Sequence, residues 1–371
     1  MTITEAARGA IMAPMTARLT RRAGLVAGAA FVATASGTHA DESTGRGALR
    51  DLADARGIRI GAAVASRPLA NEPAYRETLA REFSSVTCEN VMKPSFVQPA
   101  AGTFDFQASD AIVAFATAHG MTVRGHTLVW HQQNPAWLER VAAVGENPAD
   151  ALRDHIFGVV RHYRNDGPAP VPVWDVVNEA LTDNGLMRDT LWSRALGPRY
   201  LADAFSWAHE ADPDARLFYN DFGAEGMGRK ANAVHAMLRD LIRDGVPVHG
   251  VGLQMHVGIG AGHTPSVTDL AANIARLRTL GLDVHVTEMD VKLQTGTGGD
   301  EARRTDQAQV YADVLGTCLE AGVTSFTLWG FTDAHSWIPG FTGKPDGALP
   351  FDDAYEPKPA YHALARVLAG D

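Results

Sequence analysis

Short runs rich in Val, Ile and Leu alternate along the chain with longer runs in which apolar residues recur every three to four positions. The short runs are typical of buried parallel strands, and the longer ones of amphipathic helices. Eight strand-like runs occupy residues 58–64, 85–89, 122–126, 171–178, 217–220, 248–254, 283–288 and 325–329. Helical periodicity occupies residues 73–83, 106–119, 149–164, 199–210, 228–244, 266–280, 301–321 and 359–368. This alternation predicts an α/β protein built as a single (β/α)8 TIM barrel.

A doubly wound open sheet is the structural alternative. Such a sheet usually carries a glycine-rich phosphate-binding turn after its first strand. The first strand-like run here, residues 58–64, reads Ile-Arg-Ile-Gly-Ala-Ala-Val and lacks that turn. The length of 371 residues, with 46% hydrophobic and 20% charged positions, suits one large barrel.

Polar and aromatic side chains gather where the predicted strands end. In a (β/α)8 barrel the carboxyl ends of all strands meet at one rim, and the active sites of such barrels lie there. Seven of the eight predicted strands have such residues at or just beyond their ends, which core packing alone does not explain. The candidate site residues at this rim are Glu89, Asn90, Lys93, His126, Trp130, Asn178, Glu179, Tyr219, Asn220, Gln254, His256, Glu288, Asp290, Trp329 and Trp337.

Two apolar, β-branched runs lead directly into a glutamate. Residues 173–179 read Val-Trp-Asp-Val-Val-Asn-Glu, and residues 282–288 read Leu-Asp-Val-His-Val-Thr-Glu. Carboxylates at strand ends are often only solvated or salt-bridged, so the pair by itself does not decide between a structural and a catalytic role. Two carboxylates that share a cleft can, however, protonate a leaving group and attack a glycosidic carbon. The aromatic and amide residues around them favour this chemistry for Glu179 and Glu288.

The first forty residues have the order of an export signal. Arg21-Arg22 precede an apolar stretch, residues 23–35, and Thr38-His39-Ala40 offers small residues for cleavage. This arrangement resembles a twin-arginine signal peptide, and the stretch is too short and too rich in Ala and Gly for a membrane anchor. We therefore expect residues 1–40 to be removed near Ala40 on export to the periplasm or the medium, and residues 41–371 to form the catalytic domain.

The charge balance narrows the range of binding partners, and the cysteine count bears on whether the chain carries a disulfide. The formal net charge is −10, which argues against nucleic acid or an anionic membrane as partner and favours a neutral substrate. Cys88 and Cys318 could pair in an exported protein, but two buried free thiols are favoured because a chain of this length needs no covalent staple. No CxxC or HxxxH spacing indicates a metal, and we expect neither a metal nor a cofactor.

Six blocks of sequence, taken in order, resemble glycoside hydrolase family 10, the endo-β-1,4-xylanases. The two central blocks are Trp-Asp-Val-Val-Asn-Glu at 174–179 and Val-Thr-Glu-Met-Asp at 286–290. The other four are Glu-Asn-Val-Met-Lys-Pro at 89–94, Gly-His-Thr-Leu-Val-Trp-His at 125–131, Gly-Leu-Gln-Met-His at 252–256 and Thr-Leu-Trp-Gly-Phe-Thr-Asp at 327–333. The resemblance extends from about residue 58 to residue 368. It implies retaining hydrolysis of internal bonds in xylan and xylo-oligosaccharides, by an enzyme that we expect to be a monomer.

The resemblance also implies roles for the rim residues. Glu179 is the acid and base, Glu288 is the nucleophile, His256 donates a hydrogen bond to Glu288, and Asp290 orients His256. Among the sugar contacts, Asn178 would bind the 2-hydroxyl of the reacting sugar, Lys93 and His126 its 3-hydroxyl, and Glu89 and Asn90 the next sugar outward. Gln254 is a neutral amide beside the carboxylates, the walls of the cleft are Trp130, Trp329 and Trp337, and Tyr219 and Asn220 would serve the leaving-group side.

Three other functions are compatible with a barrel of this kind. A related glycosidase acting on cellulose or mannan would share the Asn-Glu pair at residues 178–179, so that pair does not decide the substrate. A sugar-binding barrel without activity would be favoured by loss of either glutamate, and both are present. A hydride-transferring barrel would need a nucleotide phosphate site, and the sequence shows no motif for one.

Overall fold

The strands of the computed structural model, which describes residues 47–143 and 148–371, close into a parallel barrel. Their order around the barrel is β6-β5-β4-β3-β2-β1-β9-β8, and β8 pairs with β6 to close the ring. The TIM barrel predicted from the sequence is thus confirmed. The strands are β1 Arg59–Val64, β2 Ser85–Cys88, β3 Thr122–Val129, β4 Val173–Asn178, β5 Arg216–Asp221, β6 Gly250–Leu253, β7 His256–Gly258, β8 Asp283–Lys292 and β9 Ser325–Leu328.

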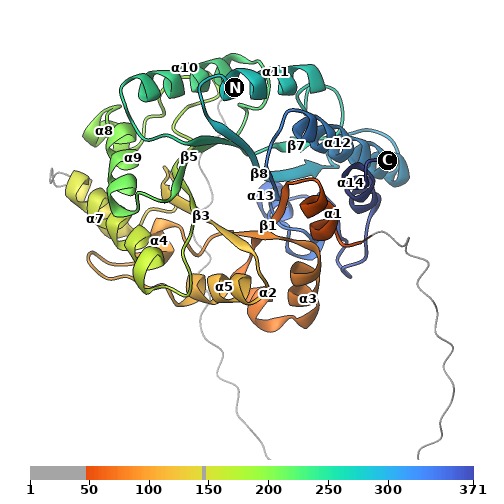
Figure 1. Ribbon diagram of the computed structural model, residues 1–371, viewed down its shortest axis with the longest axis horizontal. Coiled ribbons are helices and arrows are strands. Elements are labelled where there is room, and N and C mark those ends of the chain that lie inside the picture. Colours follow the sequence, from red (N-terminus) through yellow and green to blue (C-terminus); the bar gives the residue numbers. More distant parts are fainter. Residues whose placement is uncertain (1–46, 144–147) are drawn as a thin grey trace, which may run out of the picture. The chain divides into compact units, whose positions relative to one another are not determined.

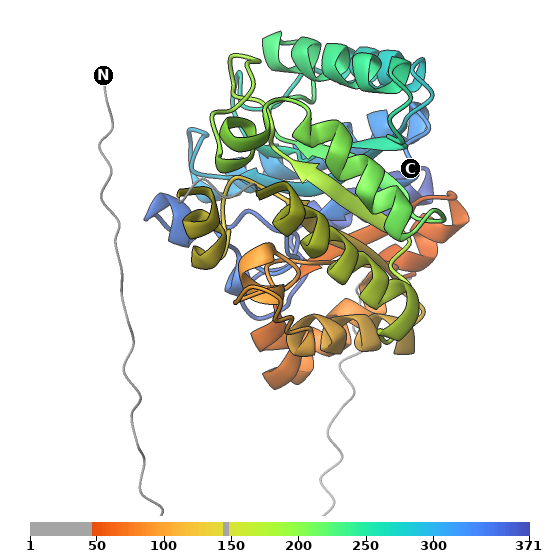
Figure 2. The same cartoon turned by 90° about the vertical axis from the view of Figure 1, so that its left-hand side faces the viewer.

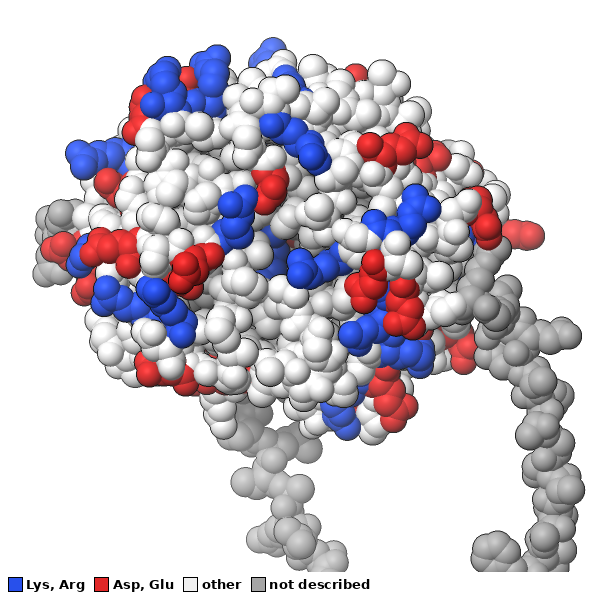
Figure 3. Space-filling view, viewed as in Figure 1, with Lys and Arg blue, Asp and Glu red and all other residues white. Residues whose placement is uncertain are grey.

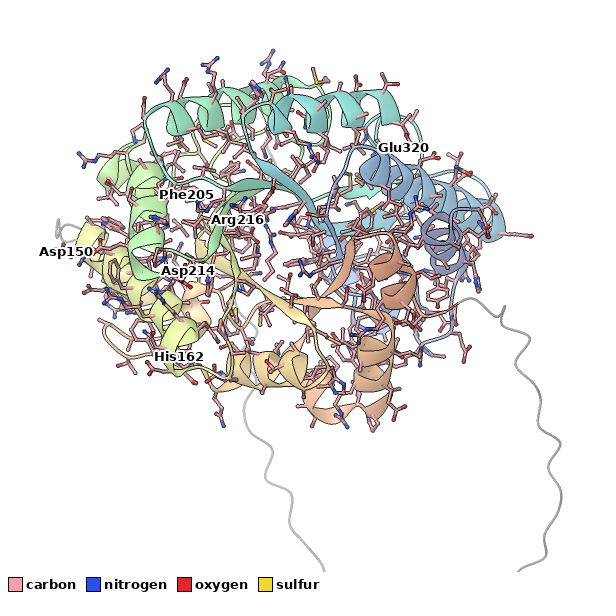
Figure 4. All side chains as sticks on the ribbon, in the orientation of Figure 1. Asp150, His162, Phe205, Asp214, Arg216 and Glu320 are labelled. Atoms are coloured by element: carbon pink, nitrogen blue, oxygen red, sulfur yellow. The ribbon has the colours of Figure 1, made fainter. Side chains whose placement is uncertain are left out.

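Helices surround the strands as an outer ring (Figure 1), and Figure 2 shows α7 to α9 in front of the barrel after a quarter turn. Asp150 on α7 and Glu320 on α12 lie in this ring, as Figure 4 shows. The helices are α1 Leu49–Ala55, α2 Ser66–Asn71, α3 Pro73–Glu82, α4 Pro94–Val97, α5 Gln107–Ala118, α6 Ala136–Ala143, α7 Pro148–Arg161, α8 Leu191–Leu196, α9 Tyr200–Ala211, α10 Arg229–Arg243, α11 Val267–Arg278, α12 Asp300–Glu320, α13 Ile338–Thr342 and α14 Pro359–Ala369.

The main core lies between the strands and this ring. The strands are buried almost throughout, which explains their continuous rather than alternating apolar runs. Helix α12 shows the complementary pattern, because its buried residues Tyr311, Val314, Leu315 and Cys318 recur at helical spacing. Cys318 and Cys88 are both buried and unpaired, which confirms the prediction of free thiols.

The structure departs from the sequence prediction at one strand and at several short helices. The predicted strand 248–254 is interrupted at Gln254–Met255, where Met255 has a φ of 64°, and the chain then resumes pairing with β8 as β7. Helices α1, α2, α4, α6 and α13 were not predicted, because four to eight residues carry too little periodicity to be recognised. The strand break matters for function, since it turns the side chains of Gln254 and His256 into the rim.

Surface features of the described residues are those of an ordinary globular domain. Basic and acidic side chains are interspersed on the face shown in Figure 3. Within residues 47–143 and 148–371, no helix combines the length and the apolar character needed to cross a bilayer. The predicted export signal, residues 1–40, lies outside the described part of the chain.

Candidate active site

Glu179 directly follows β4 in an unusual backbone conformation. Its φ is 57°, in the left-handed region that non-glycine residues seldom occupy and that is concentrated at functional sites. The turn is fixed from both sides. The backbone N–H of Glu179 donates to the Asn220 carbonyl oxygen at 2.9 Å, and Arg188 Nε donates to the Glu179 carbonyl oxygen at 3.1 Å.

Three neutral donors hold the carboxyl group of Glu179. Trp130 Nε1 donates to Oε2 at 2.9 Å, Gln254 Nε2 donates to Oε1 at 3.1 Å, and Asn178 Nδ2 donates to Oε1 at 3.3 Å. His131 Nδ1 lies 3.8 Å from Oε2, and burial lowers the pKa of this histidine although the Glu179 charge opposes that shift. None of the three hydrogen-bond donors carries a charge.

Glu288 lies within β8, and a different set of donors reaches its carboxylate. Asn220 Nδ2 donates to Oε1 at 2.6 Å, and His256 Nε2 lies 3.1 Å from Oε2. The other ring nitrogen of His256, Nδ1, lies 2.8 Å from Asp290 Oδ2. The contacts expected for His256 and Asp290 are therefore present.

The His256 ring lies between two carboxylates, and this position determines its charge. Burial alone would favour the neutral ring, but the Asp290 and Glu288 carboxylates outweigh burial and raise the pKa of His256 to about 10. His256 is therefore an imidazolium near neutral pH and can donate from both nitrogens. A cation at hydrogen-bond distance stabilises the ionised form of Glu288.

Asn220 lies behind the two carboxylates and does not line the cleft. It is fully buried, and its Nδ2 donates to Asn178 Oδ1 at 2.9 Å as well as to Glu288. Thr287 Oγ1 donates to Asn220 Oδ1 at 2.7 Å. The prediction that Asn220 contacts the leaving group is wrong, because both ends of its amide are used within the protein.

A glycine makes room for this amide. A Cβ on Gly252 would lie 2.1 Å from Asn220 Oδ1 and 2.8 Å from Thr287 Cγ2, so any side chain at residue 252 would displace Asn220. Because Asn220 donates to Glu288, the position of Glu288 depends on the absence of a side chain at residue 252 of β6.

Tyr219 is also misassigned by the sequence prediction. Its side chain is fully buried, and its hydroxyl donates to Asp221 Oδ2 and accepts from the backbone N–H of Ala180 at 3.1 Å. Residues alternate between the two sides of a strand, and Tyr219 points away from the cleft. Through its hydrogen bond with Ala180 it holds the segment after Glu179 in place, and its buried side chain does not reach the cleft.

A cleft of about 570 Å³ opens above the two glutamates. It brings together every other predicted sugar-binding residue from strands far apart in the sequence, while Asp290 lies buried behind His256. Five lining residues were missed by the sequence analysis. Phe222 and Lys292 each immediately follow or end a strand, which is the signal that could have identified them. The residues lining the cleft are Glu89, Asn90, Lys93, His126, Trp130, Gln132, Gln133, Asn178, Glu179, Phe222, Gln254, His256, Glu288, Lys292, Trp329, Trp337 and Phe341.

The end of the cleft near β2 and β3 is rich in hydrogen-bonding groups. Lys93 Nζ donates to Asn90 Oδ1 at 3.0 Å, and Asn90 Nδ2 donates to Glu89 Oε1 at 3.1 Å. Burial lowers the pKa of Lys93 and raises that of Glu89. His126 Nδ1 is held by Asp175 Oδ2 at 3.0 Å, so its opposite ring edge is the part left for the cleft.

Aromatic rings form the walls. Lys93 Nζ lies 4.9 Å from the centre of the Trp130 ring and 5.8 Å from that of Trp329. Trp337 Nε1 donates to Asp290 Oδ2 at 2.8 Å, which ties this wall to the carboxylate that orients His256. Trp192 is buried, and its Nε1 donates to the Trp130 carbonyl oxygen at 2.9 Å.

The class of the glycoside hydrolases is defined by a closed parallel barrel whose carboxyl rim carries two glutamates with different hydrogen-bond donors, in a cleft walled by tryptophans. Comparison with known proteins gives the family. Residues 48–367 match the family model for glycosyl hydrolase family 10, and the chain belongs to that family.

Relatives with known names cover most of the chain. Endo-1,4-beta-xylanase B of Thermotoga neapolitana is 39% identical, over 86% of this chain and 91% of its own length. The exoglucanase XynX of Acetivibrio thermocellus is 36% identical over 82% of this chain, which spans 28% of that protein. The crystal structure of xylanase 10B from Thermotoga petrophila RKU-1 in complex with xylobiose is 39% identical, has a TM-score of 0.79, and is matched over 87% of this chain and 97% of its own.

The charge on His256 predicts how stability depends on pH. The ordinary pKa of 6.5 applies to the unfolded chain, and the folded value is about 10, so the stabilisation is complete below pH 6.5 and is lost as the pH rises toward 10. In this window the free energy of unfolding should fall by up to about 1.4 kcal/mol per pH unit. When the free energy of unfolding is measured with urea at several pH values, its slope against pH should be shallower for His256→Gln than for the unsubstituted protein. The exposed His263→Gln should keep the slope of the unsubstituted protein, and an equal slope in all three would contradict the assigned charge.

Proposed function

We propose that the protein is a retaining endo-1,4-β-xylanase that cleaves internal bonds of xylan and xylo-oligosaccharides. The observation that carries this proposal is the unequal environment of the two glutamates. Glu288 faces an imidazolium, whereas uncharged amide and indole groups surround Glu179. One carboxylate is thereby stabilised as an ionised nucleophile, and the other remains free to hold a proton and release it.

The first chemical step transfers the sugar to the enzyme. A Glu288 oxygen attacks the anomeric carbon, the bond from that carbon to the glycosidic oxygen breaks, and Glu179 gives its proton to the departing oxygen. Asn178 and Gln254 already donate to Glu179 and remain at its side when it becomes a carboxylate. The loss of negative charge at Glu288 favours the new charge at Glu179.

The second step releases the sugar with its original configuration. Glu179 takes a proton from a water molecule, whose oxygen attacks the anomeric carbon, and Glu288 leaves as a carboxylate. The imidazolium of His256 again stabilises the charge that returns to Glu288. Protons and charges are thus restored after each cycle without any cofactor.

Trp337 is assigned as the group that distinguishes xylose from glucose. Xylose lacks the exocyclic hydroxymethyl group of glucose, and a ring closing over the reacting sugar excludes that group by contact. The Trp337 ring is fixed by its bond to Asp290 and by a T-shaped contact with His256, with ring centres 5.2 Å apart. A fixed wall discriminates by shape, because it does not move aside for a larger sugar.

Reducing ends released from xylan, cellulose and mannan test the substrate assignment. Xylan should be cleaved far faster than the other two, and a preference for cellulose or mannan would contradict it. Trp337→Ala should narrow the ratio of kcat/KM between aryl xylobiosides and aryl cellobiosides. A ratio left unchanged would exclude Trp337 as the discriminating residue.

The two glutamates can be told apart by chemical rescue. Glu179→Ala should lose activity on xylan by about 10²-fold or more, yet still show a burst of phenol from an aryl glycoside with an acidic phenol. Azide needs no base, so it should restore turnover of this variant and give the β-glycosyl azide. At Glu288→Ala, azide should fill the vacated side and give the α-glycosyl azide. Products of the reversed configuration, identified by NMR, would exchange the two roles.

Export and a monomeric state belong to the same proposal. The support for export is Arg21-Arg22, the short apolar stretch after them, and the small residues before Asp41. Replacing both arginines with lysine should leave the precursor in the cytoplasm, whereas normal export of that variant would contradict a twin-arginine signal. The exported protein should begin at Asp41 by N-terminal sequencing and sediment with the mass of one chain.

A further inference from the structure

A buried lysine lies directly beneath one aromatic wall of the cleft. Lys230, in the first turn of α10, is 3% exposed, and its Nζ lies 3.6 Å from the centre of the Phe222 ring. The same ammonium lies 2.8 Å from Asp221 Oδ1 and 3.8 Å from Asp183 Oδ1. A buried ammonium is costly unless it is paired, so this position calls for an explanation beyond the filling of space.

Phe222 lies at the end of the cleft away from the assigned outer sugar site. Strands β2 and β5 are three places apart in the ring of eight, with β4 and β3 between them. Glu89 and Asn90 follow β2, whereas Phe222 follows β5, and all three line the cleft. Glu179, after β4, lies between them. A chain bound by Glu89 and Asn90 on one side of the cleaved bond therefore extends toward Phe222 on the other.

We propose that Lys230 is a positioning residue that holds the Phe222 ring as a stacking surface for the sugar that leaves. The proposal rests on the glycanase function assigned above. An ammonium over one face of an aromatic ring attracts the ring electrostatically, most strongly where water is excluded. The opposite face is then presented to the cleft in one orientation, where the apolar face of a pyranose can stack.

Asp221 connects this surface to the acid and base. It pairs with Lys230, accepts from the Phe222 backbone N–H at 2.9 Å, and accepts from the Tyr219 hydroxyl. The Tyr219 hydroxyl in turn accepts from the N–H of Ala180, the residue after Glu179. Burial raises the pKa of Asp221 to about 7 even though the Lys230 charge opposes this shift, so loss of the lysine would favour the neutral acid. The stacking surface and the proton donor are thus built on one buried cluster.

Lys230→Met keeps the length of the side chain and removes the charge, and two substrates separate its effects. Xylotetraose places sugars on both sides of the cleaved bond, whereas β-xylobiosyl fluoride has a leaving group too small to reach Phe222. We expect kcat/KM for xylotetraose to fall about tenfold, and that for the fluoride to stay within about twofold. Phe222→Ala should show the same split, and adding Lys230→Met to it should cause no further loss.

Two further variants keep the test decisive. Asp183→Asn removes the charge of the more distant, exposed partner of Lys230. It should leave kcat/KM unchanged for both xylotetraose and the fluoride. If Lys230→Met does not fold, Asp221→Asn with Lys230→Met leaves no unpaired buried charge and should still show the split. An equal loss on both substrates, or no loss on either with the melting temperature unchanged, overturns the role of Lys230. If the unsubstituted protein hydrolyses the fluoride but no xylo-oligosaccharide, the xylanase function itself is wrong.

Discussion

Two glutamates share one cleft, the proposed mechanism requires them to hold opposite protonation states, and the hydrogen bonds of the surrounding rim fit this constraint. Like charges so placed repel each other, and burial penalises both ionised forms. The imidazolium of His256 lies at hydrogen-bond distance from Glu288. Asp290 and Glu288 together raise the pKa of His256 to about 10 against the effect of burial, and so keep the proton on the ring. Glu179 receives its hydrogen bonds from the neutral side chains of Trp130, Gln254 and Asn178.

The backbone serves the same constraint. Neutral amides bridge the carboxyl groups, since Gln254 and Asn178 reach Glu179, and Asn220 reaches both Asn178 and Glu288. Such a network tolerates almost no displacement. Residue 252 must be glycine, because a Cβ at this position would clash with the Asn220 side chain. Glu179 and Met255 adopt positive φ angles, of 57° and 64°, which aim the ends of β4 and β6 into the cleft. Both residues are locally strained in this conformation, and the surrounding barrel maintains it.

Much of this could be predicted from the sequence, and the exceptions have physical reasons. The barrel follows from eight repeats of one pattern. Glu179 and Glu288 are recognisable as carboxylates at the ends of apolar strands, but the catalytic interpretation of the pair comes from the surrounding aromatic and amide residues and from the family resemblance. Tyr219 and Asn220 were misassigned because a strand end shows which residues are near the rim but not which way each side chain points. Phe222 was missed because an aromatic residue after a strand reads equally well as core. The buried pairing of Lys230 with Asp221 joins a helix to a strand and leaves no local pattern in the sequence.

Trapping the covalent intermediate tests the central assignment most directly. A 2-deoxy-2-fluoro xylobioside with an acidic phenol as leaving group slows both steps, but the second step more, so the glycosyl-enzyme accumulates. Peptide mass spectrometry of the inactivated protein should find one added fluoroxylobiosyl group, on the peptide that contains Glu288 and on that side chain. A label on Glu179, or inactivation without any covalent label, would contradict the division of labour between the two glutamates.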